Sequence, residues 1–83
     1  MKYVLSFRNR NMSSCFPNGN GSVKDIVSFS NKDFYIYSTP EEAEGHKIFL
    51  INAIKVRKEE INNMVYASVI SKLESMQIRN INA

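Results

Sequence analysis

The sequence has few of the residues that build catalytic and metal-binding sites. It contains one cysteine, Cys15, and one histidine, His46, among its 83 residues. A single cysteine excludes an intramolecular disulfide framework and any metal site built from several thiolates. A zinc site would need two further ligands from scattered carboxylates, and a Cys15–His46 catalytic pair would need a contact that the sequence does not predict. We therefore predict no catalytic residue, no metal and no cofactor.

Long hydrophobic runs are missing as well. Residues 1–8 have too short an apolar stretch for a signal peptide, and no segment approaches the roughly 20 apolar residues that cross a bilayer as a helix. Residues 18–21, Asn-Gly-Asn-Gly, can form a phosphate-binding nest, but the Gly-Lys-Ser/Thr of a nucleotide-binding loop does not follow them. We expect a cytoplasmic protein without membrane contact.

The composition indicates one ordered domain that covers residues 1–83. A hydrophobic content of 43%, with five phenylalanines and four tyrosines, is enough for a packed core. A domain of this size rarely holds a deep active site together with the residues that support it, which favours binding over catalysis. The net charge of +3 permits contact with nucleic acid or with an acidic protein surface and requires neither.

The strongest structural signals lie between Thr39 and Met76. Thr39 and Pro40 are typical of a helix N-cap and first helical position, and Glu42 follows the cap by three residues, as in a capping box. Apolar residues then recur at the three-four spacing of a buried helical face. The first run is Ala43, Phe49, Leu50, Ala53 and Ile54, and the second is Ile61, Met64, Val65, Val69, Leu73 and Met76.

One straight helix over this stretch would be about 57 Å long, whereas a compact domain of this length has a radius of gyration of about 12 Å. We therefore predict one long broken helix or two helices, over residues 40–57 and 59–76. The break is expected within residues 55–60 or at Asn62-Asn63. Residues 48–51, Ile-Phe-Leu-Ile, also suit a buried strand, so residues 46–56 stay open between helix and strand.

Three segments before the helical region have strand patterns. Residues 3–8 alternate in hydrophobicity, and residues 22–30 and 33–38 are rich in strand-forming residues. Residues 9–21 between the first two are dense in Asn, Gly and Pro, which predicts a long loop. Asn31-Lys32 is expected to form a tight hairpin turn between the second and third strands.

These elements predict an α+β fold: a three-stranded antiparallel meander with the helices packed on one face. In the third strand we expect Phe34 and Ile36 to face the core, with Tyr35 and Tyr37 facing solvent. Residues 77–82 alternate again and predict a short C-terminal edge strand or a frayed tail.

Basic and aromatic residues supply the candidate partner-binding site. Two arginines close the first strand, two tyrosines are expected to project from the sheet, and two cations lie in the helical region. Such residues suit RNA or single-stranded nucleic acid, because aromatic rings stack on bases and cations neutralise phosphates. The candidates are Arg8, Arg10, Tyr35, Tyr37, Arg57 and Lys58.

The helical region carries more apolar surface than a three-stranded sheet can cover. Ile48, Ile51, Met64 and Met76 make up the excess. We expect a partner protein or a second copy of the chain to bury it. Protein–protein binding is therefore the leading function predicted from the sequence, and nucleic-acid binding is the alternative.

The chain resembles the small accessory proteins that bacteriophages and other mobile elements encode. The resemblance lies in the single small domain, the sheet-plus-helix layout and the frequent Asn, Ile and Lys, as in Asn9, Asn11, Asn18, Asn20 and residues 80–82. The same bias is typical of A/T-rich genomes. The resemblance implies a non-enzymatic, stoichiometric inhibitor in the host cytoplasm that covers a surface of a host or defence protein or of a toxin.

Overall fold

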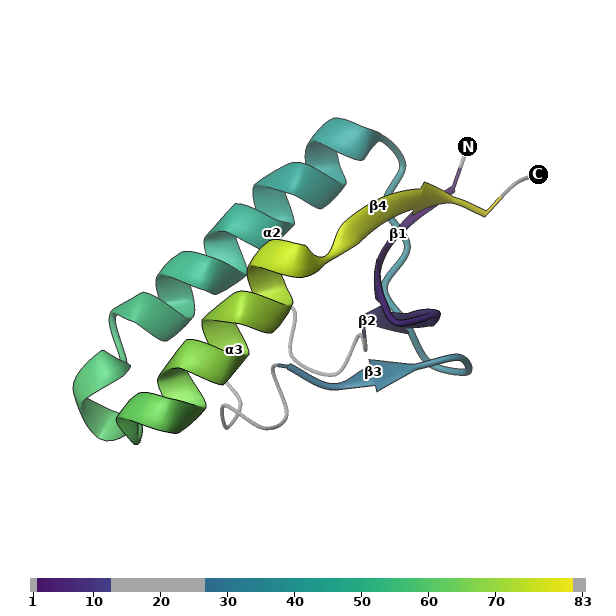
Figure 1. Cartoon of the computed structure of the whole chain (residues 1–83). Coiled ribbons are helices and arrows are strands. Elements are labelled where there is room, and N and C mark those ends of the chain that lie inside the picture. Colours follow the sequence, from purple (N-terminus) through teal and green to yellow (C-terminus); the bar gives the residue numbers. More distant parts are fainter. Residues whose placement is uncertain (1, 13–26, 82–83) are drawn as a thin grey trace.

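The protein is an α+β domain, and in the part of the chain that the structure describes two helices pack beside a four-stranded antiparallel sheet (Figure 1). The computed structural model describes residues 2–12 and 27–81. The predicted fold class is confirmed, including the C-terminal strand and the division of the helical region in two. The elements are β1 (Tyr3–Phe7), β2 (Arg10–Met12), β3 (Phe29–Ser30), α2 (Pro40–Lys55), the 3₁₀ helix η1 (Lys58–Glu60), α3 (Asn63–Ser75) and β4 (Gln77–Asn80).

Strand β1 has a neighbour on each side, in the order β3-β2-β1-β4. Arg8 and Asn9, which join β1 to β2, have φ angles of 52° and 65°. Positive φ at both central residues is what a two-residue type I′ hairpin turn requires. The prediction of a loop that begins at Asn9 is wrong at this point. The turn could not be recognised in the sequence, because Arg-Asn is not the Asn-Gly pair that usually signals it. Strand β2 therefore lies where a loop was expected.

The predicted second strand is described only at its end, as β3, and residues 22–26 lie outside the described residues. The chain bends after β3, but the tight hairpin predicted at Asn31-Lys32 is wrong, because β3 pairs with β2 and not with residues 33–38. The Ser30 Oγ accepts hydrogen bonds from the backbone N–H groups of Lys32 and Asp33, at 3.0 and 3.3 Å. A hydroxyl that accepts from the next residues in this way stabilises a local bend.

The prediction of a regular strand at residues 33–38 is wrong. Tyr37 forms an isolated antiparallel bridge with Tyr3, through backbone hydrogen bonds of 2.8 and 2.9 Å. The Tyr35 N–H donates to the Met12 carbonyl at 3.0 Å. This segment therefore follows the edges of β1 and β2 instead of extending β3, and it leads directly into α2.

Helix α2 begins where the capping signal predicts. The Thr39 Oγ1 accepts a hydrogen bond of 3.1 Å from the Glu42 N–H, and Pro40 occupies the first helical position. The Glu42 carboxylate reaches back one residue farther than a capping box predicts, to the Ser38 N–H at 2.8 Å. These bonds satisfy N–H groups that a helix start leaves without partners. The continuous helix to Lys55 excludes the strand alternative for residues 48–51.

Helix α2 ends before η1, and α3 begins after Asn62, whose Oδ1 accepts a hydrogen bond of 2.9 Å from the Met64 N–H. The Lys47 Nζ links α2 to the end of α3 through hydrogen bonds. It donates to the carbonyls of Glu74 and Met76, at 3.0 and 3.1 Å, where α3 passes into β4. These carbonyls belong to the helix end that leaves C=O groups without intrahelical partners.

The core lies between α2, α3 and one face of the sheet. It contains Leu5, Met12, Tyr37, Ala43, Leu50, Ile54, Val69, Leu73 and Met76. Of the apolar residues predicted to be in excess, Met76 is buried and Ile51 packs partly against the core, whereas Ile48 and Met64 are exposed. Val65, predicted on the buried face of α3, is half-exposed, because it lies in the first turn of the helix, near the tip of the pair.

The two helices extend away from the sheet, so that η1 lies at the end of the molecule farthest from both termini (Figure 1). The molecule is elongated accordingly, with principal extents of 41 × 20 × 20 Å. Within residues 2–12 and 27–81, no helix is both long enough and apolar enough to span a membrane.

Candidate binding surfaces

The six predicted binding residues lie in three separate places. Arg8 and Arg10 belong to the β1–β2 hairpin, and Tyr35 and Tyr37 lie beside α2. Arg57 and Lys58 lie at the tip of the helical pair, next to η1 (Figure 1). They therefore do not form one patch.

The two cations at the tip have local partners. The Arg57 Nε lies 3.9 Å from the Glu60 Oε2, and the Lys58 Nζ lies 5.4 Å from the centre of the Tyr66 ring. Exposed contacts of this kind contribute little to stability, but they hold both side chains close to the helical tip.

The predicted orientation of residues 34–37 is wrong at two positions. Ile36 is 46% exposed, whereas Tyr37 is only 3% exposed and belongs to the core. Because this segment does not continue β3, the alternation of a strand does not decide which side chains face the core. Tyr37 instead points toward α2 and is not available to stack on a nucleic-acid base.

Tyr37 is the centre of an aromatic cluster. Its hydroxyl forms a hydrogen bond with His46 Nδ1. The Tyr35 ring lies 4.7 Å from the Tyr37 ring and 5.2 Å from the His46 ring, measured between centroids. The Phe49 ring stacks on His46 at 6.2 Å, with an interplanar angle of 21°. The cluster thus joins the segment before α2 to two successive turns of that helix.

Burial keeps the Tyr37 hydroxyl in its neutral form. Burial raises the pKa of the Tyr37 hydroxyl above its ordinary value of 10.0, and the neighbouring Tyr35 adds to this rise. The hydroxyl is therefore protonated at neutral pH, and in this form it shares the hydrogen bond with His46 Nδ1.

The Tyr37 hydroxyl makes the free energy of unfolding depend on pH in the alkaline range. The folded chain holds the hydroxyl proton more tightly than the unfolded chain, so this contribution is complete below pH 10 and is lost as pH rises further. We expect the free energy of unfolding to fall by up to about 1.4 kcal/mol per pH unit above about pH 10 through this group. Urea unfolding of the wild type and of Tyr37→Phe between pH 8.5 and 11 measures the difference. Parallel pH profiles for the two proteins would contradict the prediction.

A hollow of about 490 Å³ lies beside this cluster. We call it the aromatic hollow; it is lined by Tyr35, Ile36, Tyr37, Glu42, Gly45 and His46, with Ser38 at its edge. Ile36 is 46% exposed. Phe49, which lies next to His46, is 49% exposed. The hollow therefore combines aromatic walls with one exposed apolar side chain and one carboxylate, and Phe49 adds exposed apolar surface next to His46.

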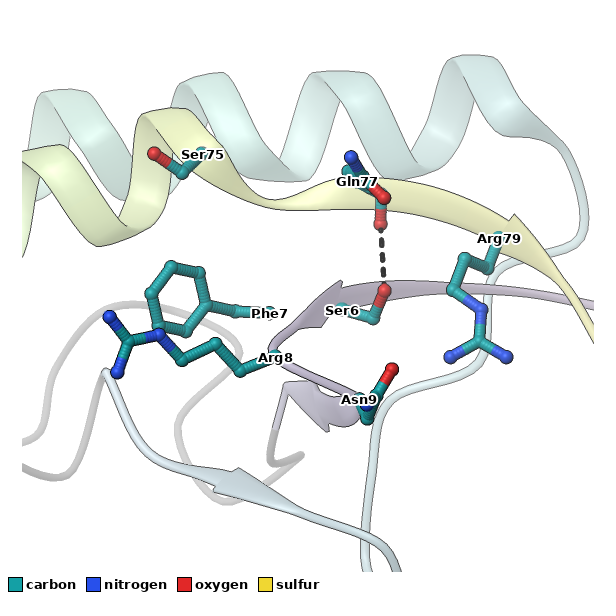
Figure 2. A pocket seen from close by; sticks show the side chains of 7 residues that line it. All are labelled: Ser6, Phe7, Arg8, Asn9, Ser75, Gln77 and Arg79. Atoms are coloured by element: carbon teal, nitrogen blue, oxygen red, sulfur yellow. Dashed lines mark hydrogen bonds between the residues drawn. The ribbon is translucent and has the colours of Figure 1, made fainter.

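A second hollow, of about 440 Å³, lies between the β1–β2 hairpin and the junction of α3 with β4 (Figure 2). We call it the arginine cup. Arg8 and Arg79 lie on opposite sides of it, and Asn9, Gln77, Ser6 and Ser75 supply polar groups between them. The Ser6 Oγ donates to the Gln77 carbonyl at 3.5 Å, which links the two strands beneath the cup.

Of the six predicted residues, Tyr35 and Tyr37 line the aromatic hollow, and Arg8 lines the arginine cup. Arg10 is exposed on β2 and lines neither hollow. Sequence reasoning missed Arg79 as a site residue. The available signal was the alternation of residues 77–82, but which strand β4 pairs with, and hence what Arg79 lies beside, is decided by the tertiary fold.

In the described part of the chain, no group of three or more His, Cys, Asp or Glu side chains is arranged to hold a metal ion. The candidate pair Cys15–His46 and the nest at residues 18–21 involve positions outside the described residues. Comparison with known protein families, with curated proteins and with solved structures finds no match to this chain.

Proposed function

We propose that this protein is a non-enzymatic binding protein that blocks a partner protein sterically, as a phage-type inhibitor of a host defence protein or toxin would. The observation that carries the proposal is the aromatic hollow, with the half-exposed Ile36 in its lining and the half-exposed Phe49 stacked on His46 beside it. Protein interfaces are enriched in aromatic residues, and their binding energy concentrates where an anchor side chain fills a pocket.

The walls of the hollow are held in place before any partner arrives. The hydrogen bond between Tyr37 and His46 joins two of its sides, and Tyr35 contacts both rings. A partner that enters a preformed hollow orders few side chains, so less of the contact energy is lost on binding.

Gly45 adds a second argument. It lies within α2, where glycine is less stable than alanine by about 1 kcal/mol. Apart from the two chain neighbours and the backbone of the helix itself, no atom lies within 4 Å of the position that a Cβ would occupy, so packing within the chain does not require glycine there. A missing side chain at the lining of a hollow lets the backbone of another molecule approach closely.

The charge next to the hollow limits the chemistry of the partner. Glu42 lines the hollow, and Glu41 and Glu44 are exposed on the first turns of α2. Complementary charge across an interface favours the correct partner and suppresses wrong ones. The proposed partner surface therefore presents an apolar anchor side chain with basic residues beside it.

The proposal is tested by replacing one residue of the hollow and one of the aromatic cluster beside it. We expect Gly45→Gln to obstruct the hollow while stabilising α2, because glutamine is the better helix former. Phe49→Ala removes an apolar contact, and we expect each variant to weaken partner binding by about 30-fold or more, the loss typical of a central interface residue. Ile48→Ala is the matched control, since Ile48 is 50% exposed on the same helix and belongs neither to the hollow nor to the aromatic cluster that contains Phe49.

The measurement starts with affinity capture from cells of the native host, followed by titration against the purified partner and an assay of that partner's activity. The proposal requires one partner protein that binds to the wild type and to Ile48→Ala but not to Gly45→Gln or Phe49→Ala. The wild type must also inhibit the activity of that partner. A partner that all four proteins bind equally would show that the hollow is not the interface.

A further inference from the structure

The arginine cup lies apart from the aromatic hollow and has a different chemistry. Its lining comes from the β1–β2 hairpin, from β4 and from the end of α3 (Figure 2). The two hollows share no lining residue. An inference about the cup is therefore independent of the function proposed above.

The charge of the cup is positive on both sides. Arg8 and Arg79 each present five N–H donors and no acceptor. None of the described residues that line the cup carries a carboxylate, and within the described chain neither guanidinium forms an ion pair. Guanidinium groups in such a setting bind oxyanions, and they match phosphate through two parallel hydrogen bonds.

The backbone of the hairpin places Arg8 in a conformation that arginine rarely adopts. Its φ of 52° is left-handed, which costs a residue with a Cβ about 1–2 kcal/mol. The guanidinium carbon lies 5.2 Å from the centre of the Phe7 ring, a cation–π contact that holds the side chain at one side of the cup. Strained residues of this kind cluster at ligand-binding sites.

The size of the cup indicates a ligand larger than a phosphate ion. About 440 Å³ falls within the range of small-molecule sites. The side-chain amides of Asn9 and Gln77 and the hydroxyls of Ser6 and Ser75 offer both donors and acceptors. A sugar and base attached to the phosphate carry the hydroxyl, amine and carbonyl groups that such residues bind.

We propose that the arginine cup binds the phosphate group of a nucleotide, with Arg79 on the phosphate and the amides on the remainder of the nucleotide, while Arg8 on the opposite side adds to the positive charge of the cup. The nucleotide is either free or one unit of a single strand, and the phosphate chemistry is the same for both. Stacking on Tyr35 and Tyr37 has no part in this proposal.

The test titrates the full-length protein with three probes: inorganic pyrophosphate, adenosine 5′-monophosphate and a mixed-sequence RNA of eight nucleotides. Binding is followed at low salt by calorimetry and by the NMR signals of the arginine Nε–H groups. We expect at least one nucleotide probe to shift the Arg79 signal, and Arg79→Gln to weaken its binding by about 10- to 100-fold, the loss expected for a hydrogen bond to a charged group.

Arg10→Gln is the matched control, because it removes the same charge from the same sheet outside the cup. It is expected to change affinity less than threefold. Preference for the monophosphate would identify a free nucleotide, and preference for RNA, with affinity that falls steeply with salt, would identify a strand. No binding of the three probes, or an equal loss with Arg10→Gln and Arg79→Gln, would overturn the proposal. The fold of each variant is checked by its thermal unfolding and amide spectrum, and Arg79→Lys, which keeps the charge, is expected to retain more affinity than Arg79→Gln.

Discussion

Replacing Leu50 with alanine is expected to lower the free energy of unfolding by about 2–5 kcal/mol. The Leu50 side chain is 1% exposed and belongs to the core between α2 and the sheet. The substitution removes buried methyl groups and leaves a cavity, and both effects destabilise the folded state. A domain of this length has a total stability of only about 4–12 kcal/mol, so the loss is a large part of the whole.

Urea unfolding of the wild type, of Leu50→Ala and of Ile48→Ala measures this effect. Ile48 lies two residues away on the same helix and is 50% exposed. Its truncation is expected to cost no more than about 0.5–1 kcal/mol, since most of the side chain already contacts water. Equal losses for the two variants would mean that α2 does not present Leu50 to the core.

Replacing Val4 with aspartate is expected to cost about 3–5 kcal/mol, or to prevent folding at 37 °C. Val4 is 0% exposed, although it lies on the face of β1 opposite Leu5, which faces the helices. The substitution removes a fully buried apolar side chain and takes a carboxylate out of water, and the cross-strand neighbour Arg79 offsets only part of this loss of hydration. It therefore tests whether β1 is buried on both faces.

Circular dichroism and urea unfolding at neutral pH measure the loss for Val4→Asp. Arg10→Asp provides a control on the neighbouring strand, where the side chain is exposed, and is expected to change stability by about 0.5 kcal/mol or less. A folded Val4→Asp protein with nearly wild-type stability would place this face of β1 in solvent.

The helical part of the fold was predictable because its signals are local. Thr39, Pro40 and Glu42 specify the start of α2 through contacts within four residues, and three-four periodicity identifies Leu50 and Leu73 as buried. The exposure of Met64 was not predictable in the same way. Its spacing fits the buried face, but it lies in the first turn of α3, at the tip of the helical pair, where 83% of it is exposed.

The strands and the candidate sites depend on tertiary contacts. No local signal marks Arg8-Asn9 as a two-residue turn, and Tyr37 is buried because it contacts His46 and pairs with Tyr3. The alternation of residues 33–38 predicted that Tyr37 faces solvent, because that prediction treats the segment as a regular strand. The arginine cup is built from elements at the two ends of the sequence, and the aromatic hollow forms only because residues 35–38 pack against α2, so composition identified some of their residues but not their grouping.

The pairing of β1 with β4 has a consequence for the order of folding. Tyr3 lies opposite Asn80 and Ser6 opposite Gln77, so these strands are separated by most of the sequence. Closing so long a loop costs entropy before any contact repays it, which slows folding relative to helical bundles. The α2–α3 pair, with its short connection, is able to form first, and the hydrogen bonds of Lys47 to the end of α3 then hold the start of β4 in position. Until β4 arrives, one edge of β1 has unpaired N–H and C=O groups, and in that interval the chain is most exposed to aggregation.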